Sequence, residues 1–436
     1  MIYTDSGNGN KIPLISLIAI LSISLTVNLP GLAVSPILAK LQEIFPHTST
    51  LETQMLTSLP NLVIIPFILL SGKLAKGKAQ TLILAIGLCV FAAAGILYFF
   101  AKSMIMLILL GCVVGVGCGL VIPLAASMIA VYFTGRRNVW ALGLKSGTSN
   151  AAVIVATLFV GWVAAYNWHL SFLVYLVPVI PILLIPFMTP GYICSHAQPP
   201  INMTAEAVHG SKTPATRPLP AKGHKLALRL LAGVIALYII CTYATIAVSY
   251  SLPFAMDHYG FSSGAVGIAT AMFFISATLA GFTLPFMIKG CKSWTILISI
   301  AISAAGLLLV SLFHSMWIYI VGIFMTGYGY GIVQPIIYDK TTSIAPDKAH
   351  ANLYFSYVLT GNYIAISCAP FFIKLMAIIF HTSTTASPNF TFFLNAAIMG
   401  LLLITGILLR KKYVFSVDPV STAARHRPAP KPVKKS

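Results

Sequence analysis

Two stretches of nine residues decide the fold of this chain: residues 115–123 read GVGCGLVIP and residues 327–335 read GYGYGIVQP. Three glycines, a valine and a proline of the first stretch recur 212 positions later in the second. The glycines are Gly115, Gly117 and Gly119 in the first copy and Gly327, Gly329 and Gly331 in the second. The same offset relates Asn150 to Asn362. Matches at one long offset predict a tandem duplication of a structural unit.

The glycines of both copies lie inside apolar sequence. A dinucleotide-binding loop would need a preceding strand in a soluble βαβ unit. Small residues in an apolar helix instead allow neighbouring helices to approach closely within a membrane. We therefore interpret the six glycines as helix-packing positions, and the proline that ends each copy as the site of a kink.

The composition places the duplicated unit in a membrane. Hydrophobic residues make up 58% of the 436 residues and charged residues 8%, and the mean hydropathy is +0.92. A soluble domain carries roughly a quarter charged residues, so this little charge cannot cover a water-facing surface. The seven cysteines fall mostly in apolar runs. We expect them to pack as small residues, without disulfides or a metal site.

Apolar runs of about 20 residues or more, the length that crosses a bilayer, predict twelve transmembrane helices. The expected ranges are 13–38, 54–75, 80–101, 104–133, 139–165, 168–189, 228–252, 263–288, 294–313, 315–338, 350–380 and 388–409. The predicted fold class is an all-α membrane protein with two parallel six-helix repeats, because an even number of spans separates the two copies. The expected parts are a cytoplasmic N-terminus (1–12), an N-terminal bundle (13–190), a cytoplasmic linker (191–227), a C-terminal bundle (228–410) and a cytoplasmic tail (411–436).

The distribution of Lys and Arg predicts the orientation. With both termini inside, all but three of the 27 basic residues fall on the inner side, as the preference of basic residues for cytoplasmic loops requires. The net charge of +19 then reflects orientation and not binding to nucleic acid. We expect the chain in the cell inner membrane, with both termini in the cytoplasm.

Two loops carry a resemblance to a known family. Residues 71–78 read SGKLAKGK and resemble the loop between the second and third helices of the major facilitator superfamily, whose signature is G-x-L-A-D-R-x-G-R-R. Residues 132–144 resemble the loop that opens the fifth helix in many members. The resemblance implies two six-helix bundles that transport a solute. It also implies that the residues at these loops act in the conformational change: Gly72, Lys76, Lys78, Arg136 and Arg137.

One position departs from the family signature. Lys76 replaces its acidic residue, which in the family helps to hold the cytoplasmic side closed. Closure of that side in this chain must therefore use other contacts.

Ionisable side chains inside a membrane usually mark function, and this chain has few. None of its eight acidic residues lies in the middle of an expected span. Glu52 and Asp257, at the outer ends of the second and seventh helices, are the candidates for proton coupling. The alternative for both is the ordinary role of a charged residue at a solvated helix end.

The candidates for solute binding are neutral side chains. Amides buried in a span need partners, and the binding sites of transporters lie near the midplane between the repeats. The expected substrate-binding residues are Asn28, Asn150, Tyr243, Tyr330, Gln334 and Asn362. Asn150 and Asn362 are favoured because they are equivalent in the two repeats, and Gln334 because its equivalent, Ile122, is apolar. Interhelical hydrogen bonding and aromatic packing are the alternative roles.

Three classes of function were compared. The first is a secondary transporter of a small organic solute, and both a metabolite or siderophore permease and a multidrug-type exporter fit. An intramembrane enzyme would need a nucleophile–base pair or two aspartates within the spans, which the sequence does not contain. A sensor on a transporter scaffold would carry longer soluble extensions. We therefore expect a monomer without enzyme activity that contacts a solute and the lipid bilayer, with no cofactor, metal or nucleic acid.

Overall fold

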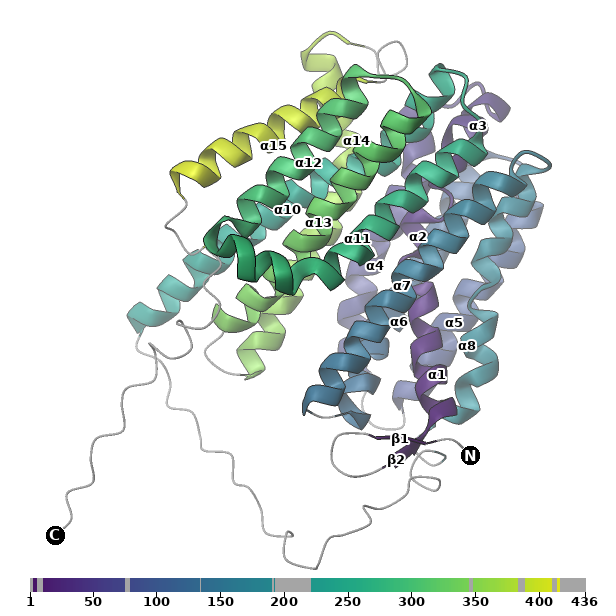
Figure 1. Ribbon diagram of the computed structural model, residues 1–436. Coiled ribbons are helices and arrows are strands. Elements are labelled where there is room, and N and C mark those ends of the chain that lie inside the picture. The colour runs from purple at the N-terminus through teal and green to yellow at the C-terminus, as the bar shows by residue number, and fades with distance from the viewer. Residues whose placement is uncertain are drawn as a thin grey trace, which may run out of the picture.

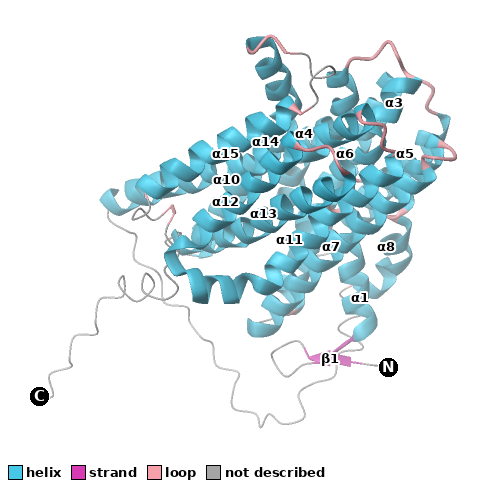
Figure 2. Ribbon diagram, turned by 45° about the horizontal axis from the view of Figure 1, so that its top comes forward, coloured by secondary structure: helices cyan, strands magenta, loops and turns pink. Residues whose placement is uncertain are grey.

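The computed structural model describes residues 3–5, 11–74, 79–133, 135–189, 192, 221–344, 348–382, 389–409 and 414–415. Figure 1 shows a bundle of long helices, with the short strands β1 (Tyr3–Asp5) and β2 (Lys11–Pro13) at one end. Apart from this antiparallel hairpin, the described elements are helical (Figure 2). The end of the bundle that carries β1 and β2 is called the hairpin end below, and the opposite end, near α3, the distal end.

The first half of the chain contributes helices from residue 14 to residue 188. Their bounds are α1 (Leu14–Ile23), η1 (Ser24–Thr26), α2 (Leu29–Leu32), η2 (Ser35–Ile37), α3 (Leu38–Ile44), α4 (Thr50–Leu74), α5 (Ala79–Leu97), η3 (Tyr98–Phe100), α6 (Met104–Tyr132), α7 (Gly135–Val163), η4 (Trp168–Leu176), α8 (Val179–Leu184) and η5 (Ile185–Met188). The fifth span, α7, begins a few residues before the expected start at 139. The expected sixth span is built largely from 3₁₀ turns.

The second half is more regular. Its bounds are α10 (Ala221–His258), α11 (Ser263–Cys291), η6 (Lys292–Trp294), α12 (Thr295–Leu312), α13 (Met316–Ile344), α14 (Lys348–Ile379) and α15 (Phe390–Leu408). α10 begins at Ala221, before the expected residue 228, so a helix continues into part of the segment expected as a linker. Most of the remaining linker and the tail after residue 415 lie outside the described residues.

The described part of the chain contains eleven apolar helical stretches that are long enough to cross a bilayer. One of them, Ser263–Leu312, is 50 residues long and includes both α11 and α12. At 1.5 Å per residue it is more than twice as long as one crossing of about 30 Å requires. It therefore holds two spans, which confirms the predicted architecture of about twelve transmembrane helices.

The first span is interrupted, although the sequence predicted one helix over 13–38. It consists of α1, η1, α2, η2 and α3, and both later breaks lie beside a proline, Pro30 in α2 and Pro36 in η2. Proline lacks the N–H that would continue the helical hydrogen bonds. We call this segment the interrupted first span.

Neighbouring helices satisfy carbonyl groups of the interrupted first span. The Ser149 hydroxyl donates to the Ser24 carbonyl at 2.9 Å, and the Tyr175 hydroxyl donates to the Pro30 carbonyl at 3.3 Å. The Cys118 thiol lies 3.6 and 3.5 Å from the carbonyl oxygens of residues 26 and 27. Such partners are what allows a broken helix to exist at membrane depth.

The glycine motif of the first half packs α6 against two helices. A Cβ atom added to Gly115 would lie 2.5 Å from the Pro60 carbonyl oxygen of α4, and one added to Gly119 would lie 2.8 Å from a carbonyl oxygen of the same helix. A Cβ on Gly117 would lie 2.6 Å from the Gly87 carbonyl oxygen of α5. The alternation of the glycines therefore brings the backbone of α6 against α4 on one face and against α5 on another.

The second half repeats this arrangement. Gly327 and Gly331 approach the backbone of α11, where a Cβ on Gly331 would lie 2.6 Å from Ala277 Cα. Gly329 approaches the Ser299 carbonyl of α12. The fourth spans of the two halves thus use equivalent glycines against equivalent neighbours. A sequence repeat corresponds here to a repeat in packing.

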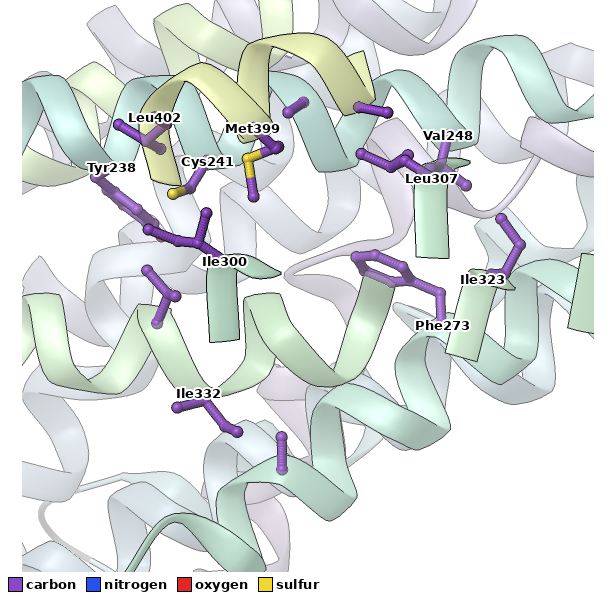
Figure 3. Close-up of a cluster of buried hydrophobic side chains, with 14 of the residues drawn as sticks. Tyr238, Cys241, Val248, Phe273, Ile300, Leu307, Ile323, Ile332, Met399 and Leu402 are labelled. Atoms are coloured by element: carbon purple, nitrogen blue, oxygen red, sulfur yellow. The ribbon is translucent and has the colours of Figure 1, made fainter. Parts of the chain in front are cut away.

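Each half has its own apolar interior, and each also presents apolar surface outward. The largest cluster of buried side chains among the described residues joins α10 to α15 and also includes Val153 of α7 (Figure 3). On the outside, Leu408, Phe286 and Trp317 are 79%, 76% and 76% exposed. Apolar side chains this exposed over the flanks of a helical bundle are typical of a lipid-facing surface.

Candidate functional site

Six polar side chains from three helices of the second half form one hydrogen-bonded group, which we call the tyrosine–amide cluster. Its members are Tyr238 and Thr242 of α10, Tyr330, Gln334 and Tyr338 of α13, and Asn362 of α14. Helical geometry explains the convergence: positions four residues apart lie on one face, which aligns the three α13 residues with one another and the two α10 residues with each other.

Gln334 is at the centre of this cluster. Its Nε2 donates to the Tyr238 hydroxyl at 3.0 Å and to the Tyr338 hydroxyl at 3.1 Å. These two hydroxyls lie 3.0 Å from each other. The amide therefore uses both of its N–H groups, while its Oε1 accepts no hydrogen bond from any residue that the structure describes.

Asn362 completes the cluster through Thr242. The Thr242 hydroxyl donates to Asn362 Oδ1 at 3.0 Å and lies 3.4 Å from the Tyr330 hydroxyl. The Nδ2 group of Asn362 donates to no side chain or carbonyl among the described residues. The cluster thus offers one unused acceptor, on Gln334, and one unused amide donor group, on Asn362.

The cluster is open on one side. Tyr238 is fully buried and Asn362 is 9% exposed, whereas Tyr330, Gln334 and Tyr338 are half-buried. The Tyr238 and Tyr330 rings are nearly parallel, with centroids 6.5 Å apart. Part of the α13 face therefore presents aromatic surface and amide groups that the protein itself does not cover.

Sequence reasoning found three of these residues and missed three. Tyr330, Gln334 and Asn362 were expected at a site, whereas Tyr238, Thr242 and Tyr338 were not. The spacing of four residues within α10 and within α13 was a signal that could have found them.

The other predicted binding residues lie elsewhere. Asn28 lies at the break before α2, half-buried, with no described hydrogen bond of its side chain. The ring of Tyr243 contacts Phe372 with centroids 4.8 Å apart, and its buried hydroxyl has no partner among the described residues. Neither side chain is hydrogen-bonded to the tyrosine–amide cluster.

Asn150 makes a polar contact between the two halves. Its Nδ2 donates to the Thr278 hydroxyl of α11 at 3.2 Å. Asn362, its equivalent in the repeat, bonds within its own half instead. Equivalent sequence positions therefore have different partners in the two halves.

The halves are closely packed towards the distal end along α7 and α11. A Cβ on Gly161 would lie 2.6 Å from the Ser263 carbonyl oxygen, and one on Gly267 would lie 2.6 Å from the Thr157 carbonyl oxygen. Gln54 of α4 adds a bond at this end, donating to the Tyr250 carbonyl at 3.1 Å.

The same pair of helices separates towards the hairpin end. Beyond the Asn150–Thr278 bond, a Cβ on Gly147 or on Gly281 would meet no atom within 4 Å. Along α7 and α11 the two halves are therefore in contact at the distal end and separate towards the hairpin end.

The two coupling candidates lie at helix ends. Glu52 forms a capping box with Ser49 at the start of α4: its carboxylate accepts from the Ser49 N–H at 2.6 Å, and the Ser49 hydroxyl accepts from the Glu52 N–H at 3.3 Å. Asp257 is exposed near the end of α10. Glu52 thus has a structural role that accounts for its position.

The predicted motif residues lie at helix ends or outside the described residues. Lys76 and Lys78 lie outside the described residues. Gly72 lies near the end of α4, and Arg136 and Arg137 lie in the first turn of α7, without described side-chain positions.

Two packed repeats of membrane-spanning helices with a polar cluster in the interior define a duplicated, polytopic α-helical membrane protein. The chain belongs to the Major Facilitator Superfamily, whose sequence model matches residues 14–246 and 232–435. It is therefore a multi-pass membrane transporter of that superfamily, and the resemblance seen in its loops is confirmed.

Two solved structures share this fold, and one curated relative is similar over part of its length. A single-residue mutant of the nucleoside transporter NupG superposes with a TM-score of 0.69 at 12% identity, over 92% of this chain and all of that one. A bacterial homolog of the human lysosomal transporter Spinster superposes with a TM-score of 0.64 at 15% identity, over 92% of this chain and 95% of that one. The multidrug transporter protein MdtP of Bacillus subtilis (strain 168) is 29% identical over 104 residues, which are 24% of this chain and 19% of that protein.

Proposed function

We propose that the protein is a secondary transporter of a small, uncharged, ring-containing organic solute, which binds at the tyrosine–amide cluster. The observation that carries this proposal is the pair of unused groups, Gln334 Oε1 and the Asn362 amide, beside half-buried tyrosine rings. A solute that offers one donor and one acceptor beside an aromatic ring would satisfy both groups. The rings would stack on it, as aromatic side chains do on flat ligands.

The packing of the two halves supports alternating access. Along α7 and α11 the halves are in contact at the distal end, and a Cβ at Gly147 or Gly281 meets no atom beyond the Asn150–Thr278 bond. This corresponds to one of the two arrangements that such a mechanism needs. Rocking of one half against the other around a fixed site would open the distal end in turn.

The names of the relatives suggest which solutes to test, but they do not indicate whether the protein imports or exports its solute. One solved relative is a nucleoside transporter and the curated relative is a multidrug transporter. Heterocyclic nucleosides and planar aromatic drugs both have the chemistry that the cluster would accept. Export and import are then alternative outcomes of the same experiment.

We place both termini in the cytoplasm of a cell whose inner membrane holds the protein. The excess of Lys and Arg on that side supports this orientation. Thiol labelling from either side of the membrane, at single cysteines placed near the two chain ends, tests it. Termini on opposite sides would exclude the two-repeat topology.

The decisive experiment is flux into proteoliposomes, with and without a proton gradient. Gln334→Ala and Asn362→Ala should each lower the rate of transport by roughly tenfold, because each removes a hydrogen bond to the solute, worth about 1.4 kcal/mol at that ratio. Asn395→Leu is the control, since it also removes a buried amide, but from α15, where neither polar atom has a described partner.

Both cluster variants should remain folded, because an interhelical hydrogen bond in a membrane averages about 0.6 kcal/mol. Normal transport by both variants would exclude this binding site. Binding without flux in the unmodified protein would favour the sensor over the transporter.

A further inference from the structure

A cavity lies between the two halves at the distal end, apart from the tyrosine–amide cluster. Its volume is about 440 Å³, and it is lined by residues of α3, α4 and α14, among them Gln42, Thr50, Gln54 and Ile373. This volume is in the range of small-molecule sites. Because α3 and α4 belong to the first half and α14 to the second, both halves contribute to its wall.

The polar groups of this cavity favour an anion. Lys374 is the one charged residue among those that line it, and its exposed ammonium group makes no described hydrogen bond. The nearest acidic residue on α4, Glu52, is not part of the wall, and its carboxylate is bound to the Ser49 N–H at 2.6 Å. The positive charge of Lys374 therefore faces the cavity without a described acidic partner.

An unused hydroxyl lies in the same wall. Thr382 Oγ1 is fully buried and has no hydrogen-bond partner among the described residues, although Thr382 lines the cavity. The C-terminus of α14 fixes its place, since the Thr382 N–H donates to the Ala377 carbonyl at 2.9 Å and the His381 N–H to the Ile378 carbonyl at 3.1 Å. With His381 at φ 49°, this is a Schellman motif.

The part of the wall that α14 contributes around Lys374 is apolar and reaches the lipid-facing surface. Ile373 and Ala377 are buried, whereas Ile378 lines the cavity and is also 61% exposed. An apolar chain could therefore extend from the cavity along α14 without leaving an apolar surface.

We propose that this cavity binds an amphiphilic monoanion, whose head group contacts Lys374 and Thr382 and whose apolar chain follows Ile373 and Ile378. A fatty carboxylate and the head group of an anionic lipid share this chemistry. Because the wall comes from both halves, the bound anion stabilises the distally closed arrangement. This last consequence rests on the proposed transport function, whereas binding itself does not.

Binding is measured on the purified full-length protein through its thermal unfolding midpoint, with decanoate as the probe and decanol as the uncharged control. Decanoate should raise the midpoint, because a ligand that binds only the folded state stabilises it, and decanol should not. Lys374→Gln should weaken the apparent affinity for decanoate by about fivefold, the scale of an exposed ion pair. Thr382→Val should weaken it as well.

Lys102→Gln is the control, because Lys102 is an exposed lysine at the distal end, like Lys374, but lies in the loop before α6 and does not line the cavity. It should bind decanoate like the unmodified protein. Equal midpoint shifts for decanoate and decanol, or equal shifts with and without Lys374, would overturn the proposal.

Bilayer nanodiscs distinguish the two sources of the anion. If phosphatidylglycerol, added to phosphatidylcholine, produces the Lys374-dependent shift and removes the response to decanoate, the occupant is a lipid head group. If decanoate acts equally in both bilayers, the occupant is a free amphiphile. Either result supports the site, and a response to neither probe contradicts it.

Decanoate should also slow flux in proteoliposomes, and less so in Lys374→Gln. A Lys374-dependent midpoint shift without any effect on measurable flux would keep the site and remove its link to the rocking of the halves. A protein that binds decanoate but carries no solute at all would contradict the proposed function alone.

Discussion

Gln334 and Asn395 are two amides in the second half with opposite surroundings. Gln334 donates two hydrogen bonds and leaves its oxygen unused on a half-buried face. Asn395 is fully buried, and neither its oxygen nor its nitrogen has a described partner. An amide without hydrogen bonds in an apolar interior costs free energy, so the two residues should respond differently to replacement.

Asn395→Leu should stabilise the protein. The leucine has a similar size, and removing an unsatisfied buried amide recovers about 1–3 kcal/mol of desolvation. We expect a higher thermal unfolding midpoint in detergent and unchanged flux. A lower midpoint would show that Asn395 has a polar partner in the folded protein.

At this scale the sequence predicted three of the six residues that form the tyrosine–amide cluster, and their role in solute binding stays a prediction. Gln334 stood out because its repeat equivalent is apolar, and the structure places it at the centre of the cluster. Tyr243 resembled Tyr330 as an aromatic residue in a span, but its ring packs on Phe372. The direction of a side chain around a helix depends on which neighbours the helix meets, and those neighbours are distant in sequence.

Among the elements, the two glycine-bearing helices α6 and α13 show the effect of duplication most directly. Each brings its glycines against the second and third spans of its own half, at distances that leave no space for a side chain. The packing therefore depends on the missing Cβ atoms and not on any particular side-chain contact. That is the arrangement typical of small residues at helix interfaces in membranes.

Gly115→Val should destabilise the fold, because its Cβ would meet the Pro60 backbone at 2.5 Å. Overpacking of this kind costs about 1–3 kcal/mol. The unfolding midpoint and the yield of folded protein measure it. Gly147→Val is the matched control, since a Cβ there meets nothing within 4 Å. A similar loss for both variants would show that valine itself, and not the close approach, is responsible.

The elements were mostly predictable from apolar length, because a bilayer leaves the backbone no alternative to helices. The interrupted first span was not. Pro30 and Pro36 were visible in the sequence, but many prolines in this chain lie inside continuous helices, as Pro253 does in α10. Whether a proline breaks or only kinks a helix depends on which neighbouring side chains bind the freed carbonyl groups. In the first span those side chains are Cys118, Ser149 and Tyr175.

For the whole molecule, the relation between the halves is the property that the sequence could not supply. The offset of 212 residues predicted two copies, the apolar runs predicted the spans, and the two together predicted a parallel repeat. The arrangement of the copies is set by a few contacts, such as Asn150 with Thr278 and Gln54 with the Tyr250 carbonyl. Alternative arrangements of such halves differ by only a few kcal/mol, which is too little to be read from composition or spacing.

Cross-linking can test this arrangement. In a background without the native cysteines, Asn150→Cys with Thr278→Cys should react readily with a short bifunctional thiol reagent, and the link should stop flux. The pair Gly147→Cys and Gly281→Cys, further towards the hairpin end, should react slowly without solute and faster when a transported solute shifts the halves. Rapid linkage of the second pair in the absence of solute would contradict the open hairpin end.

The interrupted first span also has a mechanical meaning. Its counterpart in the second half, α10, is a single helix of 38 residues, whereas the first span is a chain of five short pieces whose carbonyls are tied to other helices. A continuous helix tilts as one rigid unit, whereas a segmented helix can bend at the breaks between its segments. The first spans of the two copies should therefore differ in stiffness, and we expect bending during a transport cycle to concentrate in the first of them.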